Sequence, residues 1–165
     1  MMWVAVYTQA GAEALAVHHL ERQKFNVYMP LYLKRRNHAR QITWHKKPLF
    51  PRYVFVHLTD GSLWRKIRST VGVSDLVYMG NKPATVDDTV IEEIRGREGD
   101  DGLVRLPDPE GHKAGDQVRI TKPGLGDLCG IFEQQDDRDR VFVLLNFLGR
   151  TVRAHVRPSE VQGAF

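Results

Sequence analysis

Apolar residues follow two different periods along the chain, and their alternation predicts mixed helices and strands. Short runs rich in β-branched and aromatic residues indicate strands. Between them, apolar residues repeat every three to four positions and indicate helices. Strands are expected at 3–7, 25–29, 53–58 and 73–78, with a hairpin at 32–46 that turns near Asn37 and His38. Helices are expected at 12–24, at about 60–69 and at 88–95.

Side chains with specific roles strengthen the helix predictions. In the first helix, Ala16, Val17 and Leu20 share one face, which should point into the core. Asp60 or Ser62 can cap the second helix, and Asp87 can cap the third. Residues 1–97 are therefore predicted to form an α+β domain in which helices flank an antiparallel sheet.

The pattern changes after residue 97. Residues 98–113 are rich in Gly, Pro and Asp and show no sustained period, which predicts a flexible linker. Residues 114–165 then show a period of two, and strands are expected at 117–121, 129–133, 140–147 and 151–156. Short strands separated by turns predict a small closed β-barrel.

Charge is distributed unevenly. The chain of 165 residues has a net charge of +4, yet seven Lys and Arg residues and no acid lie between Leu31 and Val56. Such a basic run is typical of a surface that binds nucleic acid or an acidic partner. A solvated surface hairpin explains the same run equally well.

Residues that could support catalysis or bind a metal are sparse. His18 and His19 are adjacent on a helix and point about 100° apart, so they cannot share a metal. Cys129 has no CxxC partner and is better explained as a small core residue. No phosphate-binding loop, nucleotide-binding glycine motif or nucleophile elbow is present. We therefore expect a protein that is not an enzyme and that uses no cofactor or metal.

Two surfaces are candidates for binding. The segment KPLFPRYVFV (47–56) places Phe50, Tyr53 and Phe55 beside two prolines and positive charge. These rings are either core or anchors for a large partner. On the first helix, His19, Arg22 and Gln23 lie on one polar face, which can contact bases and phosphates or can simply be solvated.

Together these motifs resemble the NusG family of transcription elongation factors. The strand from Trp3 to Tyr7, HLERQ (19–23), PLFPRYVFV (48–56) and TVGVSDLVYMGNKPATV (70–86) are similar to the family's N-terminal domain. GDQVRITKPGLGDLCGIF (115–132) and VLLNFLGRTVRAHV (143–156) resemble its KOW domain, an SH3-like barrel. HLERQ and PLFP together resemble the specialised paralogue RfaH more than general NusG.

The resemblance implies a set of partners and site residues. The clamp coiled coil of the largest subunit of RNA polymerase would bind an apolar depression, whose matching residues are Tyr7, Pro48, Leu49, Phe50, Pro51, Tyr53 and Phe55. The β-subunit gate loop would contact Trp64 and Arg65. Non-template single-stranded DNA would contact His19, Arg22, Gln23 and Thr70. A small-subunit ribosomal protein would bind the barrel at Phe142, Leu144 and Phe147.

The C-terminal domain has an alternative form in RfaH, a helical hairpin that packs on the N-terminal domain and masks the polymerase site. A Glu–Arg pair helps to hold that form, and the matching residues here are the two cations Lys47 and Arg140. The β-branched residues Val141 and Val143 favour strand. We therefore expect the barrel and keep the hairpin as the alternative.

The expected function is transcription elongation and antitermination at selected operons, with coupling to the ribosome. The alternatives are a general NusG-like elongation factor and an RNA- or ribosome-binding KOW protein. The absence of a signal peptide or membrane-spanning run predicts a cytoplasmic protein, which we expect to be a monomer.

Overall fold

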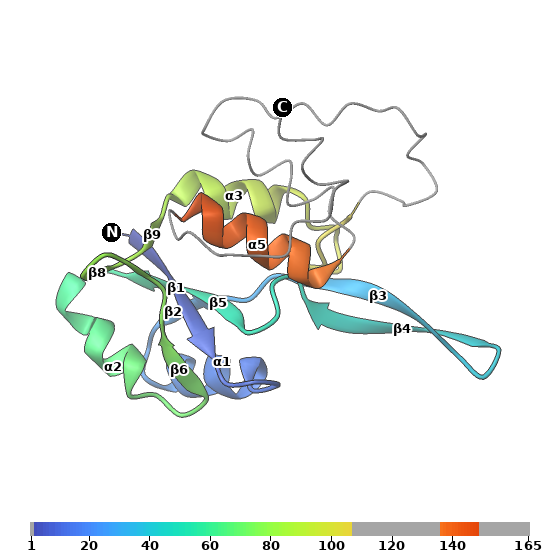
Figure 1. Cartoon of the computed structure of the whole chain (residues 1–165), viewed down its shortest axis with the longest axis horizontal. Coiled ribbons are helices and arrows are strands. Elements are labelled where there is room, and N and C mark those ends of the chain that lie inside the picture. Colours follow the sequence, from blue (N-terminus) through green and yellow to red (C-terminus); the bar gives the residue numbers. More distant parts are fainter. Residues whose placement is uncertain (1, 107–135, 149–165) are drawn as a thin grey trace. The chain divides into compact units, whose positions relative to one another are not determined.

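The computed structural model describes residues 2–106 and 136–148, which belong to two separate units, 1–105 and 106–165. The first unit contains all the strands in the described ranges (Figure 1). The strands are β1 (Met2–Thr8), β2 (Asn26–Tyr28), β3 (Leu31–His38), β4 (Gln41–Pro48), β5 (Tyr53–Leu58), β6 (Val73–Leu76), β7 (Tyr78–Met79), β8 (Lys82–Pro83) and β9 (Thr85–Val86). The helices of this unit are α1 (Glu13–Arg22), the 3-10 turn η1 (Gly61–Leu63), α2 (Trp64–Arg68) and α3 (Asp88–Gly96).

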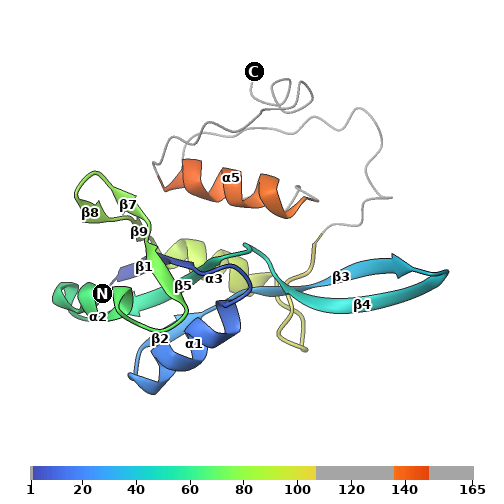
Figure 2. The ribbon, with the colours of Figure 1, turned by 60° about the horizontal axis from the view of Figure 1, so that its bottom comes forward.

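The central sheet is antiparallel, with the order β2-β5-β1-β6, and β9 also pairs with β1. Its two faces differ because side chains alternate along each strand. One face carries Val4, Val6, Val54 and Val56, which are fully buried in a core that also receives residues of α1 and α2. Helix α3 lies on the opposite side of the sheet from α1 (Figure 2).

Local chemistry explains where the helices begin. The Asp60 carboxylate accepts a hydrogen bond from the Ser62 N–H (2.9 Å) and caps η1. The Asp87 carboxylate accepts one from the Thr89 N–H (2.9 Å) and caps α3. In α1, Ala16 and Leu20 are fully buried, so the face predicted from the periodicity is the one that packs into the core.

The β3–β4 hairpin turns two residues later than predicted. Its pairing runs from Leu31↔Pro48 to His38↔Gln41, which leaves Ala39 and Arg40 as the two-residue turn. Both residues have positive φ (50° and 66°), as a tight hairpin requires. Asn37, which suggested the earlier turn, instead pairs with Ile42 in the ladder.

The predicted linker is wrong over the part that the structure describes. Residues 98–105 belong to the first unit, where Glu98 and Val104 form a β-bridge. Leu103 and Val104 are buried, and the Val104 N–H donates to the Leu31 carbonyl (2.7 Å). Burial of this apolar pair outweighs the turn-forming composition around it. The remainder of the predicted linker, 107–113, lies outside the described residues.

The strand predicted at 140–147 is also wrong, because these residues form helix α5 (Asp137–Phe147). The Asp136 carboxylate accepts a hydrogen bond from the Arg138 N–H (2.7 Å), and acids occupy the first turn. Arg140, Leu144 and Leu148 are buried at a spacing of four residues, which is a helical pattern. Capping and burial therefore override the β preference of the valines. The strands predicted at 117–121, 129–133 and 151–156 lie outside the described residues.

None of the helices in the two described ranges is long and apolar enough to cross a bilayer.

Candidate nucleic-acid and protein interfaces

Aromatic side chains gather on the sheet face that looks away from α1. The pairing of β1 with β5 places Tyr7 opposite Tyr53 and Ala5 opposite Phe55. The Tyr7 and Tyr53 rings are 5.2 Å apart, and the Phe50 ring meets the Phe55 ring edge-on at 5.9 Å. The structure therefore brings together the four aromatic residues that the family resemblance assigned to a single polymerase-binding site. We call Tyr7, Phe50, Tyr53 and Phe55 the aromatic cluster.

The members of this cluster differ in exposure. Leu49, Phe50 and Phe55 have no exposed surface, and Tyr53 is 8% exposed. Tyr7 is half-buried, as are the flanking residues Pro48 and Pro51. In this structure a partner can therefore reach Tyr7 and the prolines directly, whereas Leu49, Phe50 and Phe55 are covered.

Arg52 is part of this surface, although nothing in the sequence pointed to it. Its guanidinium lies over the Tyr7 ring (4.2 Å to the centroid), and its Nε donates to the Thr8 carbonyl (3.1 Å). Its backbone N–H donates to the Glu13 carboxylate (3.0 Å). These ties hold Arg52 at φ 72°, a left-handed conformation that costs a non-glycine residue about 1–2 kcal/mol. A cation fixed over an aromatic ring can bind a carboxylate of a partner.

Helix α3 covers the other end of the sheet face that carries the aromatic cluster. Arg95 lies between the rings of Trp3 (5.3 Å) and Tyr28 (4.6 Å). The Tyr28 hydroxyl donates to the Glu98 carboxylate, and burial together with this carboxylate raises the pKa of Tyr28. These contacts fasten α3 and the segment after it to the sheet. Trp3 is buried at this end of the face, whereas Tyr7 is partly exposed at the other.

A second site lies on α1 and the loop after α2. The Gln23 Nε2 donates to the Thr70 hydroxyl (2.7 Å) and to the His19 carbonyl (3.3 Å). The Thr70 hydroxyl donates in turn to the Lys66 carbonyl (2.8 Å), and Thr70 is buried. Gln23 and Arg22 are exposed and His19 is half-buried, so three of the four predicted DNA-contacting residues reach the surface. The fourth, Thr70, fixes the amide of Gln23 in place.

The predicted gate-loop residues begin α2. Trp64 is half-buried and meets the Tyr78 ring edge-on at 6.4 Å, so part of it packs against the core. Arg65 is exposed and stacks near the Trp64 ring at 5.5 Å. The predicted ribosome contacts Phe142, Leu144 and Phe147 lie on α5, where Leu144 is buried. Within the described ranges, no three His, Cys, Asp or Glu side chains gather to hold a metal.

Comparisons with known proteins agree on one family. A family model described as "Transcription termination factor nusG" matches residues 1–95. A transcription termination/antitermination protein NusG of Thermus thermophilus is 26% identical over 178 aligned residues, which cover 96% of each chain. The protein of the same name from Deinococcus radiodurans is 28% identical over 133 residues and covers 70% of this chain and 68% of its own. A solved structure described as "Domain interaction in Thermotoga maritima NusG" is 22% identical over 70% of this chain and 69% of its own, with a TM-score of 0.40.

Proposed function

The chain belongs to the NusG family of transcription termination and antitermination factors, and on this premise we propose that it is an elongation and antitermination factor acting on bacterial RNA polymerase at selected operons. NusG-family proteins are transcription factors that bind RNA polymerase and are not enzymes. The observation that carries the proposal is the aromatic cluster at an accessible end of the sheet, with Arg52 held over Tyr7.

The aromatic cluster suits the clamp coiled coil of the largest polymerase subunit. Tyr7 supplies a rigid ring with a polar edge, which is a typical anchor of protein interfaces. Arg52 would add a cation for the acidic side chains of a helical partner. Pro48 and Pro51 would shape the rim, and the buried residues Leu49, Phe50, Tyr53 and Phe55 would keep the anchor rigid or join the contact when uncovered. Trp64 and Arg65 would meet the β-subunit gate loop.

The α1 site suits the non-template single strand. Both hydrogen bonds of the Gln23 side chain use its Nε2, so its Oε1 remains available to a base donor. Arg22 and His19 would contact phosphates or base edges beside it. Thr70 acts as a positioning residue, because it holds Gln23 in one orientation. Sequence selectivity of the kind seen in RfaH would come from this fixed amide.

The contacts with the clamp coiled coil and with the gate loop would together hold the polymerase clamp closed. A ligand changes such an equilibrium only through its differential affinity for the two states. Binding both jaws of the cleft favours the closed state and disfavours the paused one. Contacts of α1 with DNA would add recruitment at particular sequences, which is how the factor would select operons.

A general NusG-like elongation factor is the second candidate. It is favoured by the comparison with Thermus thermophilus NusG, which aligns over 96% of both chains. A general factor would act on polymerase at every sequence, so the response to sequence separates the two functions.

The first test is binding to purified core polymerase. We expect Tyr7→Ala to weaken binding by about tenfold or more, because a central aromatic anchor is removed. Tyr7→Phe keeps the ring and should bind nearly as well. His57→Ala is the matched control, since His57 lies on the same face beside Trp3 (4.9 Å) at the far end of the sheet. Equal binding by all four proteins would refute the aromatic cluster as the contact, and a ribosome-binding protein without a polymerase role would show no binding at all.

The second test is a pause assay on elongation complexes that differ in the exposed non-template strand. His19→Ala and Arg22→Gln should reduce the response at the preferred sequence and leave binding of free polymerase unchanged. Lys24→Gln is the control, because it removes one positive charge, as Arg22→Gln does, from an exposed residue that is not part of the site. A wild-type response that is identical on every sequence would refute selective recruitment and identify the general factor.

A further inference from the structure

The basic run of the sequence forms the β3–β4 hairpin, which extends away from the central sheet (Figures 1 and 2). Every residue from 33 to 47 is exposed. The strands pair without a bulge over eight residue pairs, so the hairpin is a regular two-stranded ribbon. The proposed contacts of the aromatic cluster and the α1 site leave this ribbon unassigned.

Its register separates the side chains into two unlike faces. Residues paired across an antiparallel ladder point to the same side. One face, which we call the basic face, carries cations and imidazoles together with other polar side chains: Tyr32, Lys34, Arg36, His38, Gln41, Thr43, His45 and Lys47. The opposite face, which we call the mixed face, carries two cations, an asparagine and apolar residues, of which Leu33, Ile42 and Trp44 are exposed. Its members are Leu31, Leu33, Arg35, Asn37, Ile42, Trp44, Lys46 and Pro48.

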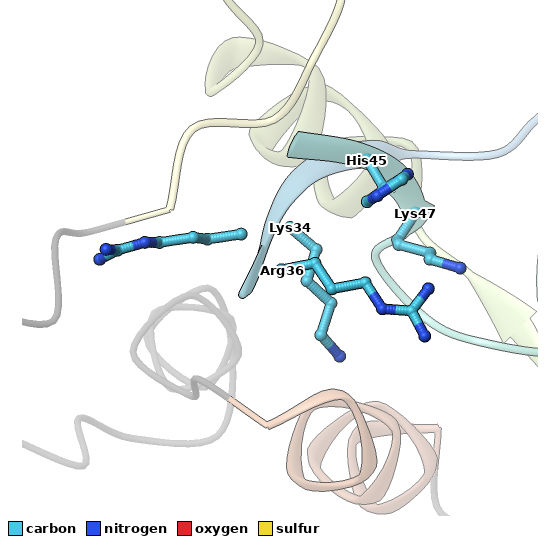
Figure 3. A pocket seen from close by; sticks show the side chains of 5 residues that line it. Lys34, Arg36, His45 and Lys47 are labelled. Atoms are coloured by element: carbon cyan, nitrogen blue, oxygen red, sulfur yellow. The ribbon is translucent and has the colours of Figure 1, made fainter. Parts of the chain in front are cut away.

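Side chains of the basic face also line most of a hollow on the hairpin. The hollow is lined by Lys34, Arg35, Arg36, His45 and Lys47, four of which belong to the basic face (Figure 3). No Asp or Glu occurs anywhere in the ribbon. An anion that approaches this face therefore meets only positive or neutral side chains from the hairpin itself.

We propose that the basic face of the β3–β4 hairpin binds the phosphate backbones of duplex DNA, independently of base sequence and of the single-strand contact at α1. Lys34, Arg36 and His38 follow one another at every second residue, which spaces them by about 6.8 Å along the strand. His45 and Lys47 lie on the neighbouring strand, about 4.8 Å away. The ribbon thus presents a two-row array of cations to a polyanion that carries one charge per about 1.7 Å of its axis.

The shape of the ribbon favours DNA over RNA. The major groove of B-form DNA is about 12 Å wide and admits a two-stranded β-ribbon. The major groove of an RNA duplex is deep and narrow, so a ribbon cannot enter it. A single strand offers one line of phosphates and would leave one of the two rows without a partner.

The test measures binding of the full-length protein to a fluorescent DNA duplex of arbitrary sequence over a series of salt concentrations, without polymerase. Lys47→Gln removes one charge from the basic face. Lys46→Gln removes the same residue type at the adjacent position, but from the mixed face and outside the lining of the hollow. Both positions are exposed, so both variants should keep the thermal stability of the wild type.

Loss of one phosphate contact should lower the slope of log affinity against log salt by about 0.9. Between 50 and 200 mM salt, the wild type should therefore lose about 3.5-fold more affinity than the basic-face variant does. The mixed-face variant should retain the wild-type slope. Equal effects in the two variants, or an unchanged slope in the basic-face variant, would overturn the proposal.

Two further binding measurements identify the kind of nucleic acid. The same sequence as single-stranded DNA and as duplex RNA should bind more weakly than the DNA duplex, and tighter binding of either would overturn the assignment. Because polymerase is absent, failure here leaves the polymerase contact standing. Conversely, a Tyr7→Ala variant that loses polymerase should still bind duplex DNA normally.

Discussion

Replacing Gly72 by alanine tests how closely α1 is held against the rest of the first unit. Gly72 has φ +88°, and a Cβ added to it would lie 2.9 Å from the backbone nitrogen of Ala16 and 3.0 Å from its Cα. The neighbouring atoms belong to the backbone of α1, so they cannot rotate out of the way. Two separate costs therefore add at this position.

The magnitude follows from these two costs. An alanine in the left-handed region costs about 1–2 kcal/mol. Forcing a methyl group into a filled space costs about a further 1–3 kcal/mol. Gly72→Ala should therefore lower the free energy of unfolding by about 2–5 kcal/mol, a large share of the stability of an ordinary domain.

Gly11→Ala is the matched control. Gly11 also has positive φ (+70°), but an added Cβ meets nothing within 4 Å. It should therefore cost only the conformational part, about 1–2 kcal/mol. Urea unfolding followed by tryptophan fluorescence reports both variants, because all three tryptophans lie in the first unit. Equal losses in the two variants would show that the close approach to Ala16 is not why glycine is needed at position 72.

The same substitution has a functional consequence. Gly72 follows Thr70 by two residues, and Thr70 holds the Gln23 side chain on α1. A shift of α1 away from the added methyl group would lengthen the 2.7 Å hydrogen bond between Gln23 and Thr70. The variant should therefore lose sequence preference in the pause assay before it loses polymerase binding.

Three other predictions follow from local geometry. The hydrogen bond from the backbone N–H of Thr89 lowers the pKa of Asp87 below its usual 3.8. The Asp87 carboxylate therefore stabilises the fold above that pH, and this stabilisation is lost as the pH falls through the lowered pKa. Asp87→Asn keeps a good helix cap without the charge, so urea unfolding should find the variant less stable than wild type at pH 7 and equally stable in strong acid. Ala39→Asn with Arg40→Gly supplies the preferred residues of a two-residue turn, so amide hydrogen exchange in the hairpin should slow, and faster exchange would contradict the turn geometry. Carbon chemical shifts of the full chain should be helical over residues 137–147, and strand-like shifts there would contradict α5.

Most elements of the first unit could be read from local patterns, although the short strands β8 and β9 were not predicted. Helix α3 begins where Asp87 predicts, and the buried face of α1 is the one that the periodicity indicates. What local patterns cannot give is contact between distant residues. The hydrogen bond from Gln23 to Thr70 spans 47 positions, and only a family resemblance linked the two residues beforehand. The left-handed conformation of Arg52 depends on Thr8 and Glu13, so no feature of the sequence around Arg52 announces it.

In helix α5 a local sequence pattern was present, but it predicted the wrong kind of element. Val141 and Val143 favour strand, but the cap at Asp136 and the spacing of Leu144 and Leu148 favour helix. The difference between the two sets of preferences is small, because each β-branched residue costs a helix less than about 0.7 kcal/mol. Burial of a single leucine contributes more than that. The surroundings of the segment therefore decide its conformation.

The proposed polymerase and duplex-DNA surfaces both depend on strand register. Arg52 lies in the short segment between β4 and β5, which connects the two ladders. A shift of one residue between β1 and β5 would place Tyr7 and Tyr53 on opposite faces of the sheet, and the same shift between β3 and β4 would mix the basic and mixed faces. The segment that joins β4 to β5 must therefore hold both ladders in place. Arg52 holds the β1–β5 side by binding Thr8 on β1 and Glu13 on α1 directly before β5 begins. On the β3–β4 side, the Leu49 N–H donates to the Pro30 carbonyl (2.8 Å) just beyond the last pair of the ladder. The strained conformation of Arg52 is thus the local cost of keeping the proposed polymerase contact in register.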